Sequence, residues 1–360
     1  MNSIHERRIS NFLATPPNGV GRAVIVNSLA SIRWMTGFAG SSAVVASSEG
    51  AVTLFSDPRY SQYLAEMPAV RAGLIQSVVK PRGDLALSIA EYLRRSSVIY
   101  MDQDSLSAAW LDRFRQASSS EVKTISLESL HSARLAKDPE EIDRIKTAAA
   151  IADESLDQTW TESASLNISE RQLQRKLDSR MISRGADSIA FPTMVASSMN
   201  SSMPHSRPTD NNVDRSQPTI IDMGAQVDGY CSDMTRTYWE KTPSLSVLRL
   251  FDAVRYALDS IESRLRVGTP FSELYQVAWQ LMDDRHLSSL MKHGVGHSIG
   301  LEVHEPPILY GNASGRIPLG CVLAIEPGLY QPGVGGVRIE NLYSISEELE
   351  LLSSAPVSLI

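Results

Sequence analysis

The sequence predicts two domains, an α/β domain over residues 1–130 and an α+β domain over residues 138–360. Short β-like runs alternate with helical segments through the first third of the chain. A serine stretch at 118–120 precedes a change of pattern, after which long amphipathic helices are separated by β-like runs. With 360 residues, the chain is long enough for each domain to bury its own hydrophobic core.

The first domain is assembled from short segments of alternating type. Helices fit residues 58–67 and 84–95, where apolar residues recur at helical spacing in the second of these. No metal-binding or nucleophilic side chains cluster in this region, so we expect the chemistry to lie in the second domain. The β-like runs of the first domain cover residues 22–26, 42–46, 51–55 and 98–101.

Capping signals mark the helices of the second domain. Residues 138–141 combine an N-cap aspartate, a proline at the first helical position and an acid at N3. Residues 169–172 form a second capping box, and that helix is expected to stop at Gly185. Two more amphipathic helices fit 246–266 and 270–285. Four β-like runs, which predict a largely antiparallel sheet, cover residues 219–223, 231–239, 321–325 and 337–345.

Composition excludes several classes of protein. A net charge of −7 provides no basic footprint, so no nucleic-acid partner is expected. No apolar stretch approaches the roughly 20 residues that a membrane span needs, and residues 1–13 lack the apolar run of a signal peptide. Two cysteines, Cys231 and Cys321, do not make a disulfide framework. These features predict a soluble cytoplasmic protein.

A first pair of carboxylates flanks a predicted hairpin. Asp222 ends an apolar run and Asp233 begins the next, with residues 227–230 as the turn. A hairpin brings both groups to one side, where their repulsion raises a pKa unless a cation lies between them. The alternative, that Asp222 caps a turn and Asp233 is solvated, is equally compatible with this pair alone.

Histidines are concentrated in one glycine-rich segment. His293, His297 and His304 are three of the seven histidines, and the glycines between the first two allow imidazoles and backbone to crowd together. The spacing of His293 and His297 is that of zinc-binding helices, but the segment is too rich in glycine for a helix and lacks the HExxH glutamate. His205 lies in a proline-bounded loop, where it can face a cleft or be merely exposed.

A second pair of carboxylates, Glu326 and Glu340, lies near the C-terminal end of the sequence. Glu326 ends an apolar run, and Glu340 follows Ile339, with Arg338 assigned to the opposite face. A surface hairpin with incidental acids is the alternative. Taken together, one histidine and four carboxylates suit two hard or borderline divalent cations that share bridging oxygens, which is typical of a hydrolase. The five candidate metal ligands are Asp222, Asp233, His297, Glu326 and Glu340.

These motifs resemble the aminopeptidase P, prolidase and methionine aminopeptidase family, whose catalytic domain has the pita-bread fold. The resemblance rests on residues 222–233, 293–305, 326–328 and 336–340. Residues 34–41 and 56–60 are similar to the creatinase/prolidase N-terminal domain. The resemblance therefore implies a creatinase/prolidase-like α/β N-terminal domain and an α+β pita-bread catalytic domain.

The same resemblance implies a role for each site residue. Asp233 and Glu340 would bridge two metal ions, Asp222 would complete one shell, and His297 with Glu326 would complete the other. Glu326 would also take a proton from the nucleophile. The residues expected to contact substrate or the tetrahedral intermediate are His205, His293 and His304, together with Arg338, which would orient Asp233 or the substrate terminus. Manganese is the expected metal, although cobalt, iron and zinc also fit this ligand set.

The resemblance further implies hydrolysis of the bond between an N-terminal residue and proline, by a water or hydroxide that bridges the two ions. The expected partner is a peptide with proline at its second position, and the expected assembly is a homodimer. The sequence leaves dipeptidase and aminopeptidase activities open. Two other possibilities remain, a non-peptidase amide hydrolase similar to ectoine hydrolase and a non-catalytic pita-bread interaction protein, although the latter class has lost its ligands.

Overall fold

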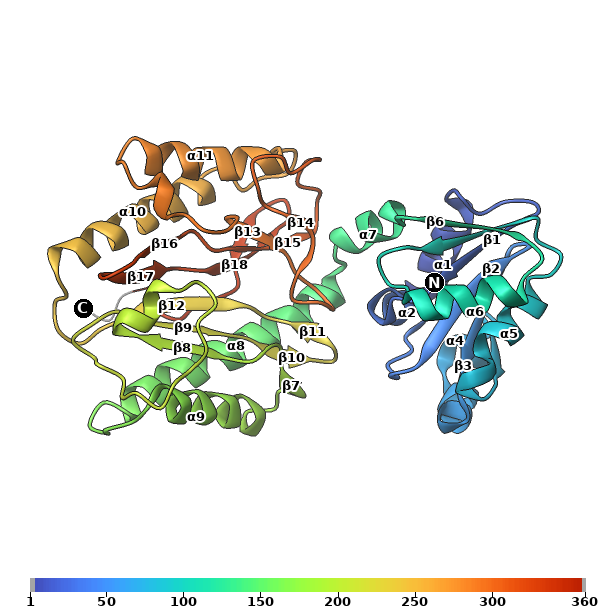
Figure 1. Cartoon of the computed structure of the whole chain (residues 1–360), viewed down its shortest axis with the longest axis horizontal. Coiled ribbons are helices and arrows are strands. Elements are labelled where there is room, and N and C mark those ends of the chain that lie inside the picture. The colour runs from blue at the N-terminus through green and yellow to red at the C-terminus, as the bar shows by residue number, and fades with distance from the viewer. Residues whose placement is uncertain (1–3, 358–360) are drawn as a thin grey trace. The chain divides into compact units, whose positions relative to one another are not determined.

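The computed structural model describes residues 4–357. The chain divides into two compact units between Arg134 and Leu135, and each unit has its own sheets and covering helices (Figure 1). None of the helices within residues 4–357 has the length and apolar character needed to cross a membrane.

The first unit is built on a six-stranded mixed sheet in the order β4-β3-β2-β1-β5-β6 (Figure 1). Strand β2 runs antiparallel to both neighbours, whereas β1–β5, β5–β6 and β3–β4 are parallel pairs. The strands are β1 Arg22–Val26, β2 Ala43–Ser48, β3 Ala51–Ser56, β4 Gln76–Val79, β5 Val98–Asp102 and β6 Glu121–Ile125. The helices are α1 Ile4–Ala14, α2 Leu29–Thr36, α3 Ser61–Glu66, α4 Pro68–Arg71, α5 Leu85–Tyr92, α6 Ala108–Ala117 and α7 Glu128–Leu135, with 3₁₀ turns at Pro58–Tyr60 and Arg82–Asp84.

The α/β prediction for this unit is confirmed, and all four predicted strands are present. Strands β4 and β6 do not follow from the sequence pattern. They are the two edges of the sheet and keep much of their side-chain surface exposed, so their residues are more polar and lack a continuous apolar run. The helix expected over 58–67 is divided into a 3₁₀ turn and α3.

The second unit consists of antiparallel sheets between two pairs of helices. In Figure 1, α10 and α11 cover one side of the strands, and α8 and α9 cover the other. Its helices are α8 Pro139–Glu162, α9 Glu170–Ser183, α10 Leu245–Glu262 and α11 Phe271–Asp283, with 3₁₀ turns η3 Ser198–Ser202 and η4 Ser288–Leu290. Each named strand pair in this unit is antiparallel, which confirms the α+β prediction.

Four sheets hold these strands. Their orders are β12-β9-β8, β11-β10-β7, β14-β13-β15-β18-β19 and β16-β17. In the N-terminal half the strands are β7 Ser188–Ile189, β8 Met194–Ser197, β9 Thr219–Met223, β10 Ala225–Val227, β11 Tyr230–Cys231 and β12 Met234–Tyr238. In the C-terminal half they are β13 Gly296–Ser298, β14 Glu305–Ile308, β15 Cys321–Ile325, β16 Gly328–Gln331, β17 Gly335–Arg338, β18 Asn341–Ile345 and β19 Leu349–Leu351.

The capping predictions for α8 and α9 are confirmed. The Asp138 carboxylate accepts the Glu141 N–H at 3.1 Å, and the Glu141 carboxylate accepts the Asp138 N–H at 3.0 Å. Ser169 and Gln172 form the same reciprocal pair at the start of α9. Each pair satisfies backbone donors that the first helical turn leaves without a partner, so the sequence determines where these helices begin.

Two predicted strands are broken, and each break carries a candidate ligand. The run 231–239 divides into β11 and β12 around Asp233, and the run 337–345 divides into β17 and β18 around Glu340. At both points the chain leaves one sheet and enters another. Gly224 allows the close crossing at the first break, because a Cβ there would lie 2.0 Å from the Ser232 carbonyl oxygen.

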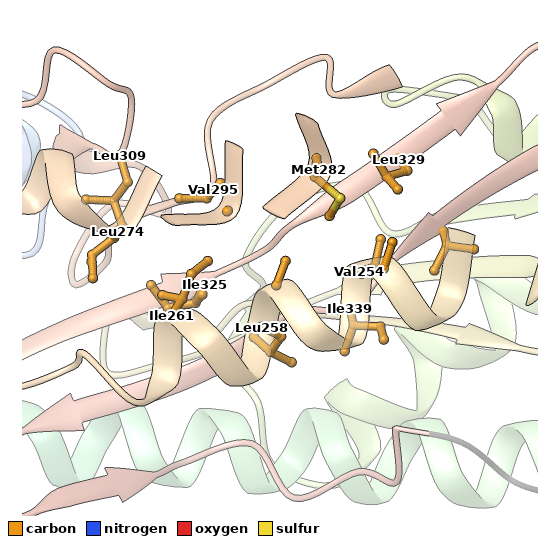
Figure 2. Packing of buried hydrophobic residues seen from close by; sticks show 14 of the residues in the cluster. Val254, Leu258, Ile261, Leu274, Met282, Val295, Leu309, Ile325, Leu329 and Ile339 are labelled. Atoms are coloured by element: carbon orange, nitrogen blue, oxygen red, sulfur yellow. The ribbon is translucent and has the colours of Figure 1, made fainter. Parts of the chain in front are cut away.

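The core beneath the second break is formed by α10, α11 and strands β15–β18, together with Val295 just before β13 (Figure 2). Ile325 and Ile339 are fully buried in this cluster, and Figure 2 shows them beside the helix that carries Leu258 and Ile261. Both isoleucines immediately precede a candidate ligand. Because neighbouring side chains along an extended backbone point to opposite faces, the core packing directs the next side chain away from the core.

Truncation of Ile339 tests this support. Ile339→Ala should lower the free energy of unfolding of the second unit by about 2–5 kcal/mol, because it leaves a cavity in a fully buried cluster. Leu245→Ala is the control, since Leu245 is 85% exposed and its change should stay within about 0.5 kcal/mol. Calorimetry or urea unfolding of the full chain measures both, and equal losses would contradict the packing described.

Candidate metal centre

The five proposed ligands come from both halves of the second unit. The two main sheets meet at Glu340, whose backbone N–H donates to the Thr235 carbonyl oxygen at 3.0 Å. Asp222 lies in β9, Asp233 immediately precedes β12, His297 lies in β13, Glu326 immediately follows β15, and Glu340 precedes β18. The predicted hairpin and strand positions therefore place each ligand at a strand or at its end.

Three carboxylates face one another with oxygen atoms that lack a partner. One oxygen each from Asp222, Asp233 and Glu340 lies within 4.8 Å of the others. Within residues 4–357, Asp222 Oδ1, Asp233 Oδ1 and Glu340 Oε1 are buried and accept no hydrogen bond. Buried unpaired carboxylate oxygens are costly unless a cation binds them, so this group fits a divalent metal ion.

His297 completes a second group of possible ligands with Asp233 and His304. Its Nε2 atom lies 3.5 Å from Asp233 Oδ2 and 4.0 Å from Glu340 Oε1. Its Nδ1 atom is 3.1 Å from the Ser298 carbonyl oxygen, which can only accept, so Nδ1 carries the proton. The Nε2 lone pair is therefore directed at the carboxylates, as metal binding requires.

Glu326 lies outside these two groups of atoms. Its Oε2 atom is 3.8 Å from His293 Nδ1. Burial, together with the negative charge of Glu340, raises the pKa of the Glu326 carboxyl well above its usual value. Glu326 thus lies beside His293 and close enough to Glu340 for their charges to interact.

Burial and mutual repulsion dominate the electrostatics of the cluster. Burial and the charge of Glu340 raise the pKa of Asp233 well above its usual value. Burial and the charge of Asp222 raise the pKa of Glu340 to about 7. Without cations, burial and repulsion therefore oppose ionisation of these carboxyls, and bound cations would lower their pKa values.

Arg338 holds several parts of the site at once. It is 2% exposed, and its Nη2 donates to Asp222 Oδ2 at 2.7 Å while its Nε donates to Thr235 Oγ1 at 3.0 Å. Burial alone would lower the pKa of the guanidinium, but its interactions with Tyr330 and Asp222 outweigh burial and raise that pKa above its usual value. Thr235 Oγ1 in turn donates to Glu340 Oε2 at 2.8 Å. One guanidinium thus links ligands from both sheets.

Two sequence-based expectations for Arg338 are corrected by these contacts. Its guanidinium binds Asp222 rather than Asp233, because Asp222 lies directly opposite Thr235 in the β9–β12 pair. Arg338 also lies on the same side as Glu340, since both contact Thr235 Oγ1. Residues two apart in an extended strand share a face, and that rule places Arg338 and Glu340 together.

Tyr330 connects Arg338 to His293. Arg338 Nη1 donates to the Tyr330 hydroxyl at 2.7 Å, and that hydroxyl donates to His293 Nε2 at 2.8 Å. His293 Nδ1 donates to the Gly294 carbonyl oxygen at 2.7 Å. Burial and the charge of Arg338 lower the pKa of His293 to about 4. His293 is therefore a neutral imidazole at pH 7, oriented by hydrogen bonds at both nitrogens.

His205 and His304 lie on exposed segments at the edge of the cluster. The rings of His297 and His304 meet edge to face, with their centroids 4.4 Å apart. Burial and His297 lower the pKa of His304, and His205 contributes to the lowering for both His293 and His304. His205 follows Pro204, whose carbonyl oxygen accepts from Arg338 Nη1 at 3.1 Å.

Several contributing residues do not follow from the motifs. Thr235 and Tyr330 are hydroxyl residues that orient the charged groups, and strand alternation from Asp233 places Thr235 on the site face. Lys137 carries no motif signal. Its buried Nζ is 3.0 Å from Ser298 Oγ and 3.2 Å from Glu305 Oε2, so it binds both ends of the segment that carries His304.

Comparisons with known proteins identify the family. The model of metallopeptidase family M24 matches residues 143–347, and the creatinase/prolidase N-terminal domain matches residues 20–134. The chain belongs to metallopeptidase family M24. The predicted fold, a creatinase/prolidase-like N-terminal domain followed by a pita-bread catalytic domain, is therefore confirmed. Membership of this metallopeptidase family also implies divalent metal ions and a peptide substrate.

Three relatives illustrate the similarity. The Xaa-Pro dipeptidase of Pyrococcus furiosus is 30% identical over 260 residues, which cover 72% of this chain and 74% of the relative. The structure of an Xaa-Pro dipeptidase from Bacillus anthracis has a TM-score of 0.91 at 27% identity, with 99% of each chain covered. The X-Pro aminopeptidase structure from Thermotoga maritima has a TM-score of 0.81 at 27% identity, covering 94% of this chain and 97% of that chain.

Metal removal should make the stability of this M24 peptidase depend on pH. The pKa of Glu340 is raised from 4.5 to about 7, so the folded metal-free protein binds more protons than the unfolded chain within that window. Its Tm should therefore fall as pH rises from 4.5 to about 7, measured by calorimetry after chelation. Glu340→Gln should show a smaller fall, because an amide does not titrate, and an equal fall would contradict the assignment.

The buried Lys137–Glu305 pair provides a separate test. Lys137→Met should lower the free energy of unfolding by about 3–5 kcal/mol, because Glu305 loses its buried cation. The double variant Lys137→Met/Glu305→Gln should recover most of that loss, since no buried carboxylate then lacks its cation. Urea unfolding of both variants measures the difference, and a double variant no more stable than Lys137→Met would contradict the coupling of the pair.

Proposed function

We propose that this M24 peptidase uses two divalent metal ions to hydrolyse the bond between an N-terminal residue and proline. The observation that carries the proposal is the group of facing carboxylates whose buried oxygens accept no hydrogen bond within residues 4–357. One imidazole nitrogen points at the same group. The names of the similar proteins, Xaa-Pro dipeptidase and X-Pro aminopeptidase, support proline-directed cleavage.

The ligand assignment follows the two groups of close atoms. Asp233 belongs to both groups, which supports a bridging role, and Glu340 has its unpaired oxygen facing His297 Nε2. Asp222 would complete the shell of one ion, and His297 with Glu326 would complete that of the other. Bound ions of this kind lower the pKa of a coordinated water and polarise the scissile carbonyl. The oxygen-rich ligand set favours manganese.

The remaining residues would hold the substrate and move protons. Glu326 is a carboxylate beside the cluster, with its Oε2 3.8 Å from His293 Nδ1, and it would take the proton of the nucleophile. His205 and His304 lie on exposed segments, where they would donate hydrogen bonds to the carbonyl oxygen as it gains negative charge. His293 is held neutral and would line the same side of the site.

Arg338 has a different role from the one expected of a substrate-binding residue. All of its polar atoms contact the protein, through Asp222, Thr235, Tyr330 and Pro204. We therefore assign it to the orientation of Asp222 and His293, and through Thr235 to the orientation of Glu340. The substrate contact would be left to the three histidines.

Two further expectations from the sequence stay predictions, and the choice between dipeptidase and aminopeptidase activity stays open. Light scattering in solution can test whether the protein is a homodimer, and cell fractionation can test the cytoplasmic location. A preference for dipeptides or longer peptides needs the substrate panel described next. The non-peptidase amide hydrolase and the non-catalytic interaction protein are disfavoured, because the five ligands are all present and the similar proteins are peptidases.

Purified protein with Mn²⁺ should cleave Xaa-Pro or Xaa-Pro-Xaa peptides and leave Met-Xaa peptides largely intact. Asp233→Asn and Glu340→Gln should reduce cleavage to background, because each residue would contact both ions. Glu347→Gln, an exposed acid outside the site, should retain full activity. Product analysis by mass spectrometry, with metal content measured in parallel, decides the outcome. Failure of the metal-loaded protein to cleave any proline-containing peptide would refute the proposal.

A further inference from the structure

Glu170 carries a buried carboxylate that the proposed chemistry does not use. It lies in the first turn of α9 and is 1% exposed. Its Oε1 accepts the Ser197 N–H at 2.6 Å. Its Oε2 accepts from Asn200 Nδ2 at 2.8 Å, from the Thr209 N–H at 2.8 Å and from Thr209 Oγ1 at 2.6 Å. Four donors thus converge on one buried carboxylate.

The donors to Glu170 flank the loop that carries His205. Ser197 ends β8, Asn200 lies in η3, and Thr209 follows the loop. One carboxylate therefore binds the chain both before and after residues 201–208. His205 itself is exposed, so burial of its own side chain does not determine its position.

A chain of hydrogen bonds continues from Glu170 to the residue beside His205. Asn200 donates to Glu170 Oε2, and Ser206 Oγ donates to Asn200 Oδ1. On the other side of His205, the Pro204 carbonyl oxygen accepts from Arg338. His205 therefore lies between two residues that are fixed by hydrogen bonds. Pro204 is bound by Arg338, and Ser206 is joined to Glu170 through Asn200.

We propose that Glu170 is a positioning residue that holds His205 over the metal centre, an inference that rests on the proposed function of His205. The physical argument is preorganisation. A hydrogen-bond donor stabilises developing charge only when it is already in place, and a misplacement of about 1 Å can cost about 10²-fold in rate. An exposed histidine on a loop reaches that precision only if both ends of the loop are held.

The carboxylate is specifically required at this position. Glutamine has nearly the same shape, but one of its two terminal atoms is an amide nitrogen that donates. Oε1 accepts one donor and Oε2 accepts three, so the amide nitrogen would face an N–H or O–H donor in either orientation. Glu170→Gln therefore breaks the contacts with almost no change of volume.

The test compares Glu170→Gln with a matched control at the same junction. Arg171 and Asp210 form an ion pair of 2.9 Å beside it, in which Asp210 is 83% exposed, and exposed pairs contribute little. We expect Glu170→Gln to lower kcat by about 10²-fold and to change KM less than about threefold. Asp210→Asn should leave both constants unchanged. Thr209→Val, which removes only one donor, should lie between them and provides a milder variant if Glu170→Gln folds poorly.

A double variant separates positioning from general destabilisation. If Glu170 acts through His205, Glu170→Gln should have almost no further effect on kcat in a His205→Ala background. An equal loss in both backgrounds, or an unchanged kcat in the folded single variant, would overturn the proposal. The rate constants should be measured at saturating metal and well below Tm, so that every variant is fully folded and differences in stability do not change kcat.

Hydrogen exchange provides a readout that does not require catalysis. The amides of Ser197 and Thr209 should exchange faster in Glu170→Gln and remain unchanged in Asp210→Asn. If the wild type proves inactive on every peptide, the proposed function fails while this measurement still reports on the loop. Unchanged exchange at both amides would refute the role of Glu170 independently of activity.

Discussion

The buried guanidinium of Arg338 is the interaction on which the site depends. A charge removed from water must be paired and hydrogen-bonded, and Arg338 meets that requirement with Asp222, Thr235, Tyr330 and the Pro204 carbonyl oxygen. Each of these partners leads to a different part of the centre. They connect the guanidinium to a candidate ligand, to Glu340, to His293 and to the loop of His205.

The net negative charge of the site favours the binding of cations. Four carboxylates surround the centre, while His293 is held neutral and Arg338 compensates chiefly Asp222. Burial, together with the excess negative charge, raises the pKa of Asp233, Glu326 and Glu340, so the protein alone disfavours their ionised forms. The two halves of the second unit contribute equally to this negative charge. Each half has two helices, and each has two of the four acids in or next to its strands.

The sequence was sufficient for the four long helices of the second unit, for its antiparallel strands and for the position of each candidate ligand at a strand or its end, because these depend on local signals. Capping boxes, periodicity and isolated acids at the ends of apolar runs are all visible within a few residues. Thr235, Tyr330, Lys137 and Glu170 were missed because their partners are distant in the chain, as in the contact of Lys137 with Glu305. The contact of Arg338 with Asp222 was not predicted for the same reason, since the two residues are 116 positions apart in the chain.

Core residues and candidate ligands alternate along the chain, and this alternation makes hydrophobic packing and metal binding depend on the same strand register. Ile325 precedes Glu326 and Ile339 precedes Glu340, so a register error of one residue would exchange the members of each pair. Such a molecule would bury two acids among α10 and α11 and present two isoleucines to the metal centre. Misregistered chains would therefore lose the hydrophobic core and the ability to bind metal in the same step. Metal content would then serve as a count of correctly folded molecules.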